Sequence, residues 1–485
     1  MLFNSIQFVV FLPVVFLLYW FVFDRFIRKS NHQLQLQNAF VVVASYVFYG
    51  WWDWRFLILI AITSFCSWGS GLLIGEAGSK KEAKTWMWLN IVLNLCILAF
   101  FKYYDFFVTE FAQLFKISTE GLLLKVILPV GISFYTFQAL SYSIDVYRGK
   151  IEPTRDIVAF FAFISFFPQL VAGPIERATN LLPQFLKKRE FNYDTAADGM
   201  RQILWGLFKK IVVADSCAVY VDQVFSTFTE QSGSTLLLAA VLFTFQIYGD
   251  FSGYSDIAIG TAKLFGVRLM RNFNVPYFSR DIAEFWRRWH ISLTTWFRDY
   301  LYIPLGGSRV SKAKVIRNTF IIFLVSGFWH GANWTFIVWG AYHALLFLPL
   351  ILMGKNRKYT NLVAEERVMP TIKETGQMLL TFILAVMGWI IFRAKSIDEA
   401  WDYFNGLFSK SLFSMPWLKN KETYLVIMSS ILVMLVVEWI NRGRQHGLAF
   451  SPKMPIGLRY LVYVLLTVVI IRFSGTPSAF IYFAF

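Results

Sequence analysis

A histidine inside an apolar run is the side chain of this sequence best suited to chemistry. His330 closes the stretch 320–330, which is hydrophobic enough to lie in lipid. An ionisable side chain at membrane depth is costly and usually faces a protein interior or a water-filled cavity. Because imidazole titrates near neutrality, such a histidine suits proton transfer. The alternative is a histidine that only hydrogen-bonds between helices.

Two carboxylates form a second candidate constellation. Asp250 and Asp256 lie at the junction of two apolar runs, with Gly249 and Gly253 beside them. The glycines predict a break in the helix, and broken helices at membrane depth are tolerated where they line a cavity. We therefore expect both carboxylates to face a substrate. The alternative is an interfacial turn in which they cap the next helix.

Basic and amide side chains form two further clusters. Arg287 and Arg288 precede His290 and suit phosphate binding at the cytoplasmic face. They equally suit an interfacial helix whose long side chains only reach the membrane surface. Asn333 follows His330 by three residues, so it is a candidate for orienting the imidazole or binding an acyl oxygen. Its alternative role is to cap a helix.

Several chemistries are excluded by what the sequence lacks. It contains no GxSxG elbow, HExxH, P-loop or dinucleotide fingerprint, and its three cysteines stand far apart. We expect neither a bound metal nor a permanent cofactor. No aspartate follows His290 or His330 by four residues, so any catalytic carboxylate must come from elsewhere in the fold. The remaining histidines, at positions 32, 343 and 446, are expected to be non-catalytic.

The composition indicates which elements must hold these groups. Of 485 residues, 57% are hydrophobic and only 16% charged, whereas soluble domains carry about a quarter charged residues. Repeated apolar runs of roughly 17–25 residues predict an all-α polytopic membrane protein. The net charge of +16 sits mainly in short loops, which favours the positive-inside rule over nucleic-acid binding. Residues 1–23 read as a first span, not as a cleaved signal peptide.

Loop charge predicts an orientation. Basic clusters at 25–29, 80–84 and 148–155 alternate with neutral or acidic turns, which places the amino terminus outside. Residues 157–171 are short for a span and read as re-entrant, and 285–297 read as one amphipathic helix at the interface. With final spans near 379–392, 424–440 and 458–471, we expect about 11 spans and re-entrant segments. About 12 helical residues place His330 roughly 18 Å from the cytoplasmic boundary.

At these residues the chain resembles the membrane-bound O-acyltransferase superfamily, and within it the bacterial branch that includes the alginate O-acetyltransferase membrane subunit. The similar stretches follow the family's order: LPVGISFY (128–135), AGP (172–174), YGDFSGYSD (248–256), EFWRRWHISL (284–293), DYLYIPLGG (299–307) and WHGAN (329–333). The resemblance covers most of the chain from about 40 to 392. It implies one integral-membrane domain over 1–485, with a motif-rich core at about 120–350 and helices ringed around a tunnel.

The resemblance also implies roles for the candidate residues. The family's nearly invariant histidine falls on His330, the expected general base, and its second polar position falls on His290. The other candidates, including Trp329 beside the base, are expected to contact substrate. The implied donor is a cytoplasmic thioester, either acetyl-coenzyme A or an acylated carrier protein. The implied acceptor is an exported glycan such as alginate or an extracytoplasmic acetyltransferase partner, at the bacterial inner membrane among its lipids.

The sequence leaves other functions open. The same fold serves D-alanyl transfer to teichoic acid, peptidoglycan O-acetylation and lipid acylation. A transporter that relays protons through His330 belongs to a different class. It is disfavoured, because the sequence shows no paired broken helices in two matching halves. A membrane scaffold for an export complex would not need the histidine at all.

Overall fold

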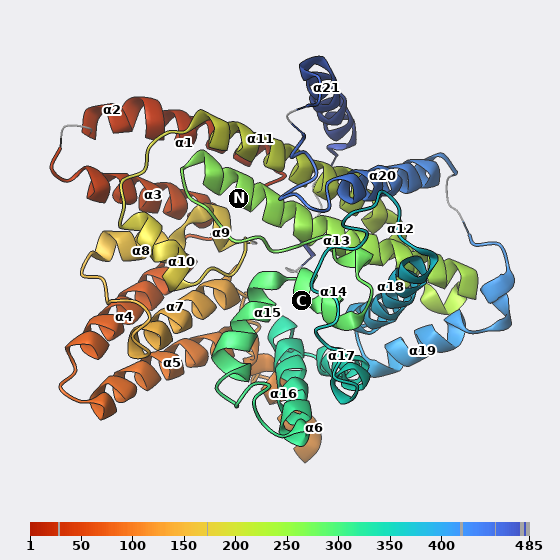
Figure 1. Ribbon diagram of the computed structural model, residues 1–485. Coiled ribbons are helices and arrows are strands. Elements are labelled where there is room, and N and C mark those ends of the chain that lie inside the picture. Colours follow the sequence, from red (N-terminus) through yellow and green to blue (C-terminus); the bar gives the residue numbers. More distant parts are fainter. Residues whose placement is uncertain (28–29, 172, 418–420, 452, 476–479, 482–485) are drawn as a thin grey trace. The chain divides into compact units, whose positions relative to one another are not determined.

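The computed structural model describes the chain except residues 28–29, 172, 418–420, 452, 476–479 and 482–485 (Figure 1). The described residues form helices and no strand, as the apolar runs predict. Part of the basic loop 25–29 and the first residue of the motif at 172–174 lie outside the described residues. The chain divides into two compact units, residues 1–200 with 258–270 and residues 201–257 with 271–485.

The first unit is built from short and long helices in chain order. They are α1 (Ile6–Leu17), η1 (Leu18–Phe23), α2 (Asp24–Ile27), α3 (Gln33–Gly50), α4 (Phe56–Glu76), α5 (Lys80–Lys102), α6 (Tyr104–Phe115), α7 (Ile132–Tyr147), α8 (Ile157–Ser165), α9 (Phe167–Leu170) and α10 (Ala178–Phe185). Two helices run through both units, α11 (Tyr193–Leu207) and α13 (Gly233–Leu264).

The second unit holds all of the predicted site residues. Its helices are η2 (Phe208–Ala214), α12 (Asp215–Ser226), η3 (Phe228–Glu230), η4 (Pro276–Phe278), α14 (Ile282–Arg288), α15 (Ile291–Phe297), η5 (Arg298–Tyr302), α16 (Lys312–His330), α17 (Trp334–Leu352), α18 (Ile372–Arg393), α19 (Ile397–Leu407), η6 (Lys410–Phe413), α20 (Lys421–Ile440) and α21 (Ile456–Phe473).

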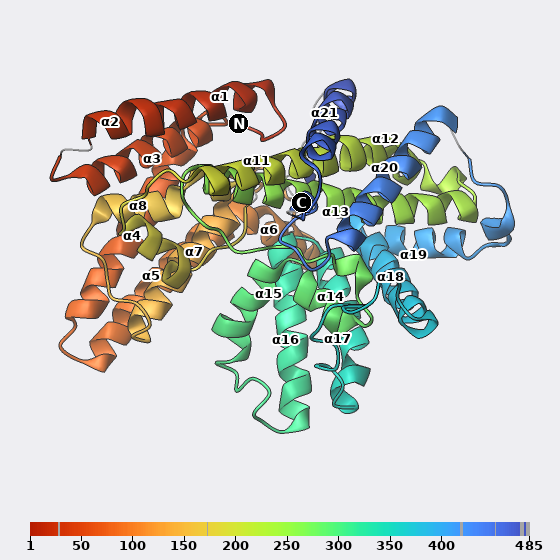
Figure 2. The same ribbon diagram turned by 45° about the horizontal axis from the view of Figure 1, so that its top comes forward.

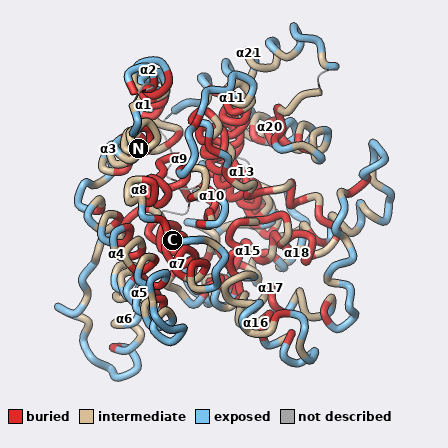
Figure 3. Tube along the Cα trace, turned by 60° about the vertical axis from the view of Figure 1, so that its left-hand side comes forward, coloured by how far each residue is buried: buried red, intermediate tan, exposed pale blue. Residues whose placement is uncertain are grey.

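Among the described residues, seven helices are long and apolar enough to cross a membrane: Ile6–Ile27, α4, α5, α13, α17, α18 and α21. These helices differ in how far they are buried (Figure 3). In the most apolar 18-residue stretch of α13, 83% is buried against protein, whereas in α21 the corresponding share is 11%. An apolar helix that is largely exposed, such as α21, suits contact with lipid. The predicted run 157–171 is divided between α8 and α9, each far too short to cross.

Buried polar side chains join three helices of the first unit. α4, α5 and α7 lie side by side (Figure 1 and Figure 2). Between them Asn90 Nδ2 donates to Ser143 Oγ at 2.6 Å, and Ser67 Oγ donates to Asn90 Oδ1 at 3.2 Å. In an apolar surrounding such bonds contribute about 0.6–2 kcal/mol each and fix the helices' rotation.

The predicted break at Gly249 and Gly253 is wrong, because α13 continues without interruption from Gly233 to Leu264. The glycines serve close packing instead. A Cβ on Gly253 would lie 2.8 Å from the carbonyl oxygen of Gly206, and one on Gly249 would lie 2.9 Å from that of Lys209. Small residues here let two helix backbones approach each other.

The single amphipathic helix predicted over 285–297 is also wrong. The segment consists of α14 and α15, separated by Trp289 and His290. The chain can turn there because His290 adopts a left-handed conformation, with φ 44° and ψ 54°. Both short helices bury most of their side chains in the second unit, so the segment is part of the protein core.

A close helix pair holds His330. α16 and α17 pack along each other, and His330 is the last residue of α16. A Cβ on Gly340 would lie 2.3 Å from the carbonyl oxygen of Phe323, and one on Gly327 would lie 2.1 Å from that of Phe336. This approach leaves no room for side chains and fixes the end of α16. α16 itself carries three basic residues in its first turns and is not among the seven apolar helices.

Candidate active site

Two predicted histidines of the second unit meet at one tryptophan. The ring of Trp329 lies with its centroid 5.0 Å from that of His330 and 6.1 Å from that of His290. All three side chains are buried. Residues 40 positions apart in the chain are therefore brought into one cluster. A group placed against Trp329 has two imidazoles within reach.

Two further aromatic rings pack against His330. Trp339 and Phe392 place their rings edge-on to the imidazole, with centroid distances of 5.2 and 5.4 Å. Trp339 also contacts Trp286 of α14 at 5.5 Å. These rings form an apolar side of the site, and beside apolar groups hydrogen bonds and developing charges interact more strongly than in water.

His290 is held by polar partners as well as by rings. Its Nδ1 lies 3.1 Å from Asn272 Oδ1 and 3.4 Å from Ser292 Oγ, and the ring of Phe251 packs edge-on at 4.6 Å. Its Nε2 is buried and has no hydrogen-bond partner among the described residues. Burial lowers the pKa of His290 to about 3, so the imidazole is neutral at physiological pH.

A cavity of about 620 Å³, within the size range of ligand pockets, is lined by residues that neighbour this cluster, including Trp286 and Ile291. Trp286 and Phe323 provide apolar walls, and Arg287, Arg298 and Arg357 provide positive charge. Because Trp286 also contacts Trp339, only two aromatic rings separate the cavity from His330. The combination suits a ligand with an anionic head and an apolar or acyl end.

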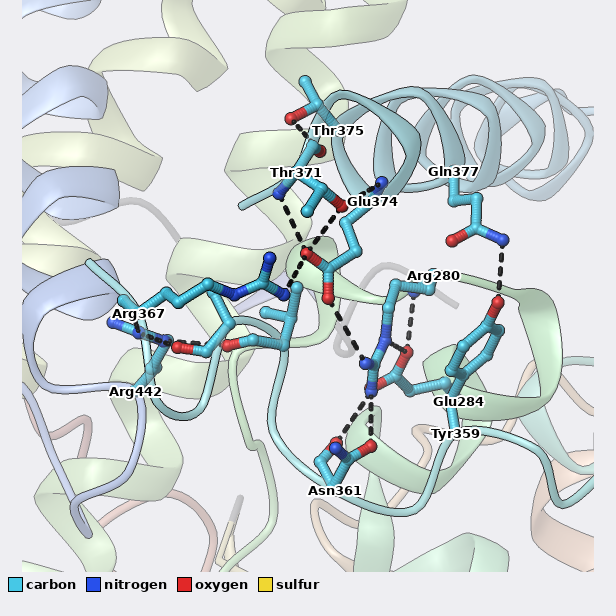
Figure 4. Close-up of polar contacts among 12 residues, drawn as sticks. Arg280, Glu284, Tyr359, Asn361, Arg367, Thr371, Glu374, Thr375, Gln377 and Arg442 are labelled. Carbon is cyan, nitrogen blue, oxygen red and sulfur yellow. Dashed lines mark hydrogen bonds and ion pairs between the residues drawn. The ribbon is translucent and has the colours of Figure 1, made fainter. Parts of the chain in front are cut away.

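Arginine side chains anchor the loop that borders this cavity. Arg287 donates to the carbonyl oxygens of Asn356 and Tyr359 at 2.8 and 2.6 Å. Arg280 donates to the carbonyl oxygen of Asn361 at 2.8 Å, and Figure 4 shows its guanidinium between Asn361 and Glu284. The loop after α17 is thereby fixed over α14, with the ring of Tyr359 4.4 Å from the Arg280 guanidinium.

Arg288 is placed differently from Arg287. Its guanidinium is buried, forms an ion pair with Glu284 at 2.7 Å and donates to Asn361. A phosphate contact by Arg288 would require this pair to break. Arg287 lines the cavity, so it is the better placed of the two predicted phosphate ligands.

Asp250 and Asp256 lie among buried lysines. Lys210 Nζ contacts Asp250 at 2.6 Å and Asp215 at 2.7 Å, and Lys209 Nζ contacts Asp256 at 2.6 Å. The backbone N–H of Ile481 also donates to Asp250. Both carboxylates are thus neutralised inside the protein, which explains how they persist in the apolar helix α13. They do not cap a helix.

The comparisons with known proteins decide the family. The sequence model of the membrane-bound O-acyltransferase family matches residues 82–390. The chain belongs to this family. It is therefore an O-acyltransferase and a multi-pass membrane protein, as its apolar helices also indicate.

Named relatives of this acyltransferase cover most of its length. The probable alginate O-acetylase AlgI of Pseudomonas aeruginosa is 39% identical, over 94% of this chain and 84% of that protein. The peptidoglycan O-acetyltransferase of Helicobacter pylori is 35% identical, over 87% of this chain and 82% of that protein. The teichoic acid D-alanyltransferase of Bacillus subtilis is 28% identical, over 55% of this chain and 69% of that protein.

Asn333 caps a helix, which is the alternative role predicted for it. Its Oδ1 accepts from the N–H of Thr335 at 2.9 Å and caps α17, and its Nδ2 donates to the carbonyl oxygen of Lys395 at 2.8 Å. Both ends of the amide are engaged. Its predicted contact with an acyl group stays a prediction that would require one of these bonds to open.

Several residues of the candidate site were not predicted from the sequence. Lys209 and Lys210 neutralise the two aspartates, and their signal is a pair of lysines inside the apolar stretch 203–214. Asn272 and the cavity residue Arg357 carried no signal, because each belongs to an irregular segment. Of the histidines expected to be non-catalytic, His32 is exposed, whereas the other two are buried.

Proposed function

We propose that this protein transfers an acetyl group from a cytoplasmic thioester donor across the bacterial inner membrane for O-acetylation of an exported polysaccharide such as alginate. His330 serves as the general base and His290 as a second polar group. The proposal places the amino terminus outside and the basic loops in the cytoplasm.

One observation carries the proposal: His330 and His290 converge on Trp329 in the buried part of the second unit. The pair supplies imidazole nitrogen atoms in a buried site, which suits the positioning and proton transfer of acyl transfer from a thioester. The similarity to proteins called probable alginate O-acetylases, over more than nine-tenths of this chain, supports the choice of acetyl group and polysaccharide.

The cavity beside the pair is the proposed donor site. Acetyl-coenzyme A and acylated carrier proteins both present a phosphopantetheine arm, which joins a negative phosphate to a long neutral chain ending in the thioester. Arg357 provides positive charge for the phosphate, and Arg298 lies in the same lining but is paired with Asp299 at 2.7 Å, while Trp286 lies on the side toward His330. A guanidinium is well matched to phosphate because it donates several hydrogen bonds in one plane.

The proposed reaction exchanges one bond to the acetyl carbonyl carbon for another. The acceptor oxygen attacks the thioester carbonyl carbon, a C–O bond forms, and the C–S bond breaks. His330 takes the hydroxyl proton and returns it to the departing thiolate, so no net proton is consumed. A neutral imidazole is required at the start, because only the neutral form can accept the hydroxyl proton.

Peptidoglycan is the second candidate acceptor. The peptidoglycan O-acetyltransferase of Helicobacter pylori aligns over most of both chains, whereas the teichoic acid relative aligns over 55% of this one. Both candidates use an acetyl donor and the same two histidines, so they differ only in the polymer that enters from outside.

The experiment that tests the function uses inside-out membrane vesicles from cells producing the full-length protein. Radiolabelled acetyl-coenzyme A is added, with deacetylated polymannuronate or with peptidoglycan fragments inside the vesicles. Alkali-labile label on polymannuronate is the expected result. Label on peptidoglycan alone would identify peptidoglycan, and not the exported polysaccharide, as the acceptor. Label on neither polymer would overturn the proposal.

A further inference from the structure

Asn272 contacts His290 with an atom that the network identifies as oxygen. The same atom lies 3.3 Å from the backbone nitrogen of Ser292 and 2.9 Å from Ser292 Oγ. A backbone N–H can only donate, so its partner must be an acceptor. The side-chain amide of Asn272 therefore points its oxygen at His290, and its Nδ2 donates to Ser255 Oγ at 3.1 Å.

This orientation determines which nitrogen of His290 carries the proton. A carbonyl oxygen accepts, so Nδ1 must be the protonated nitrogen in the 3.1 Å contact. In a neutral imidazole the other nitrogen then carries a lone pair. Nε2, the buried atom without a partner among the described residues, is therefore a hydrogen-bond acceptor and has no proton to donate to an oxyanion.

The backbone around the pair holds the same arrangement. His290 lies in the left-handed region, which is strained for a non-glycine residue and persists only where the surrounding structure holds it. The N–H of Ile291 donates to the carbonyl oxygen of Asn272 at 2.8 Å, and the N–H of Asn274 donates to that of Arg288 at 2.9 Å. These two bonds join the segment of Asn272 to both sides of His290. The strained conformation and the side-chain contact thus support each other.

We propose that Asn272 is a positioning residue that holds His290 as a hydrogen-bond acceptor for a hydroxyl of the acyl acceptor. The inference rests on the proposed acyl transfer and assigns different tasks to the two histidines. His330 removes the proton from the attacking hydroxyl, while Nε2 of His290 accepts a hydrogen bond from a second hydroxyl and orients the acceptor. A polyhydroxylated glycan supplies both groups.

The test is the Asn272→Leu variant, which keeps a similar volume and removes the acceptor oxygen. With the acceptor concentration varied in the vesicle assay, kcat/KM for the polymer labelled by the wild type should fall roughly 10-fold, as expected for one lost hydrogen bond in a buried site. The KM for acetyl-coenzyme A should stay within about twofold. Asn272→Asp, which retains an acceptor oxygen toward Nδ1, should restore most of the loss.

Two further variants separate positioning from structural damage. Asn94→Leu removes a buried asparagine of α5 whose amide donates to Asn90 in the first unit and should leave both constants unchanged. In a His290→Ala background the Asn272→Leu change should cause no further loss, because Asn272 acts only through His290.

The results distinguish the two proposals. Wild-type kinetics in Asn272→Leu, or equal losses in Asn272→Leu and Asn272→Asp, would overturn the positioning role while leaving the acyltransferase function intact. A wild-type protein that labels neither polymer would overturn the proposed function and with it this inference.

Discussion

Aromatic rings, more than charged groups, surround the two histidines. Trp329 contacts both imidazoles, and Trp339 and Phe392 also pack against His330. The sequence predicted His330 because an ionisable residue in an apolar run is conspicuous, and His290 because it lies in a basic motif that resembles the family's second polar position. It could not predict Asn272, since asparagine in an irregular segment usually serves a turn. Its role depends on a contact across 18 positions of the chain that no local pattern encodes.

At the scale of single residues, Arg357 tests the donor cavity. Its guanidinium lines the cavity, and loss of one charge-assisted phosphate contact costs about 1.5 kcal/mol. Arg357→Ala should therefore raise the KM for acetyl-coenzyme A on the order of tenfold and leave kcat within about twofold. Arg309→Ala removes an exposed arginine of a neighbouring loop as the control. An unchanged KM in Arg357→Ala would place the donor elsewhere.

A buried carboxyl in the first unit gives a pH-dependent prediction. Burial raises the pKa of Glu176 from 4.5 to about 7, while the side chain accepts from the N–H of Met270 and from Asn180. The folded protein thus holds this proton more tightly than the unfolded chain does. The stabilisation is complete below about pH 4.5 and is lost as the pH rises to about 7.

Glu176→Gln should remove this dependence, since the amide stays neutral at every pH. The melting temperature of the purified protein should fall from pH 5 to 7.5 by roughly 2–4 °C in the wild type and by less in the variant. Glu190→Gln, at an exposed carboxyl, is the matched control. Equal slopes in Glu176→Gln and the wild type would contradict the assignment.

At the scale of elements, a glycine in an apolar run can indicate either a helix break or close helix packing, and the sequence does not distinguish the two. Gly249 and Gly253 predicted a broken helix, yet they allow α13 to pack closely on another backbone. A break does occur in the segment 285–297, which was predicted to be one helix. It lies at His290, where the sequence contains no glycine or proline to indicate it. Helix existence followed from apolar periodicity, whereas breaks depended on tertiary contacts that supply the cost of a strained residue.

The pair α16–α17 is the element on which the site depends most. Gly340→Ala would place a Cβ 2.3 Å from the carbonyl oxygen of Phe323, a backbone atom that cannot yield without moving α16. We expect a loss of several degrees in melting temperature and of most transfer activity. Gly376→Ala in α18, where nothing lies within 4 Å, should be neutral or slightly stabilising. A Gly340→Ala variant with wild-type stability would refute the close packing.

At the scale of the whole molecule, composition and loop charge predicted the class of protein, a polytopic helical membrane protein. They did not predict which side chains pair with each other or which acceptor is used. The low charged fraction predicted a polytopic helical protein, and the helices and the family confirm this. The buried lysines that neutralise Asp250 and Asp256 were missed, because ion pairs join distant segments of the chain. Acceptor choice stays a proposal, since it depends on surfaces that the family motifs do not describe.

The most direct test of the account is the transfer of label by His330→Ala. Vesicles containing this variant at wild-type protein levels should release no coenzyme A beyond background and place no alkali-labile acetyl label on the polymer. His32→Ala, at an exposed loop histidine, should match the wild type. Wild-type rates of labelling by His330→Ala would contradict the assignment of His330 as the base of acyl transfer.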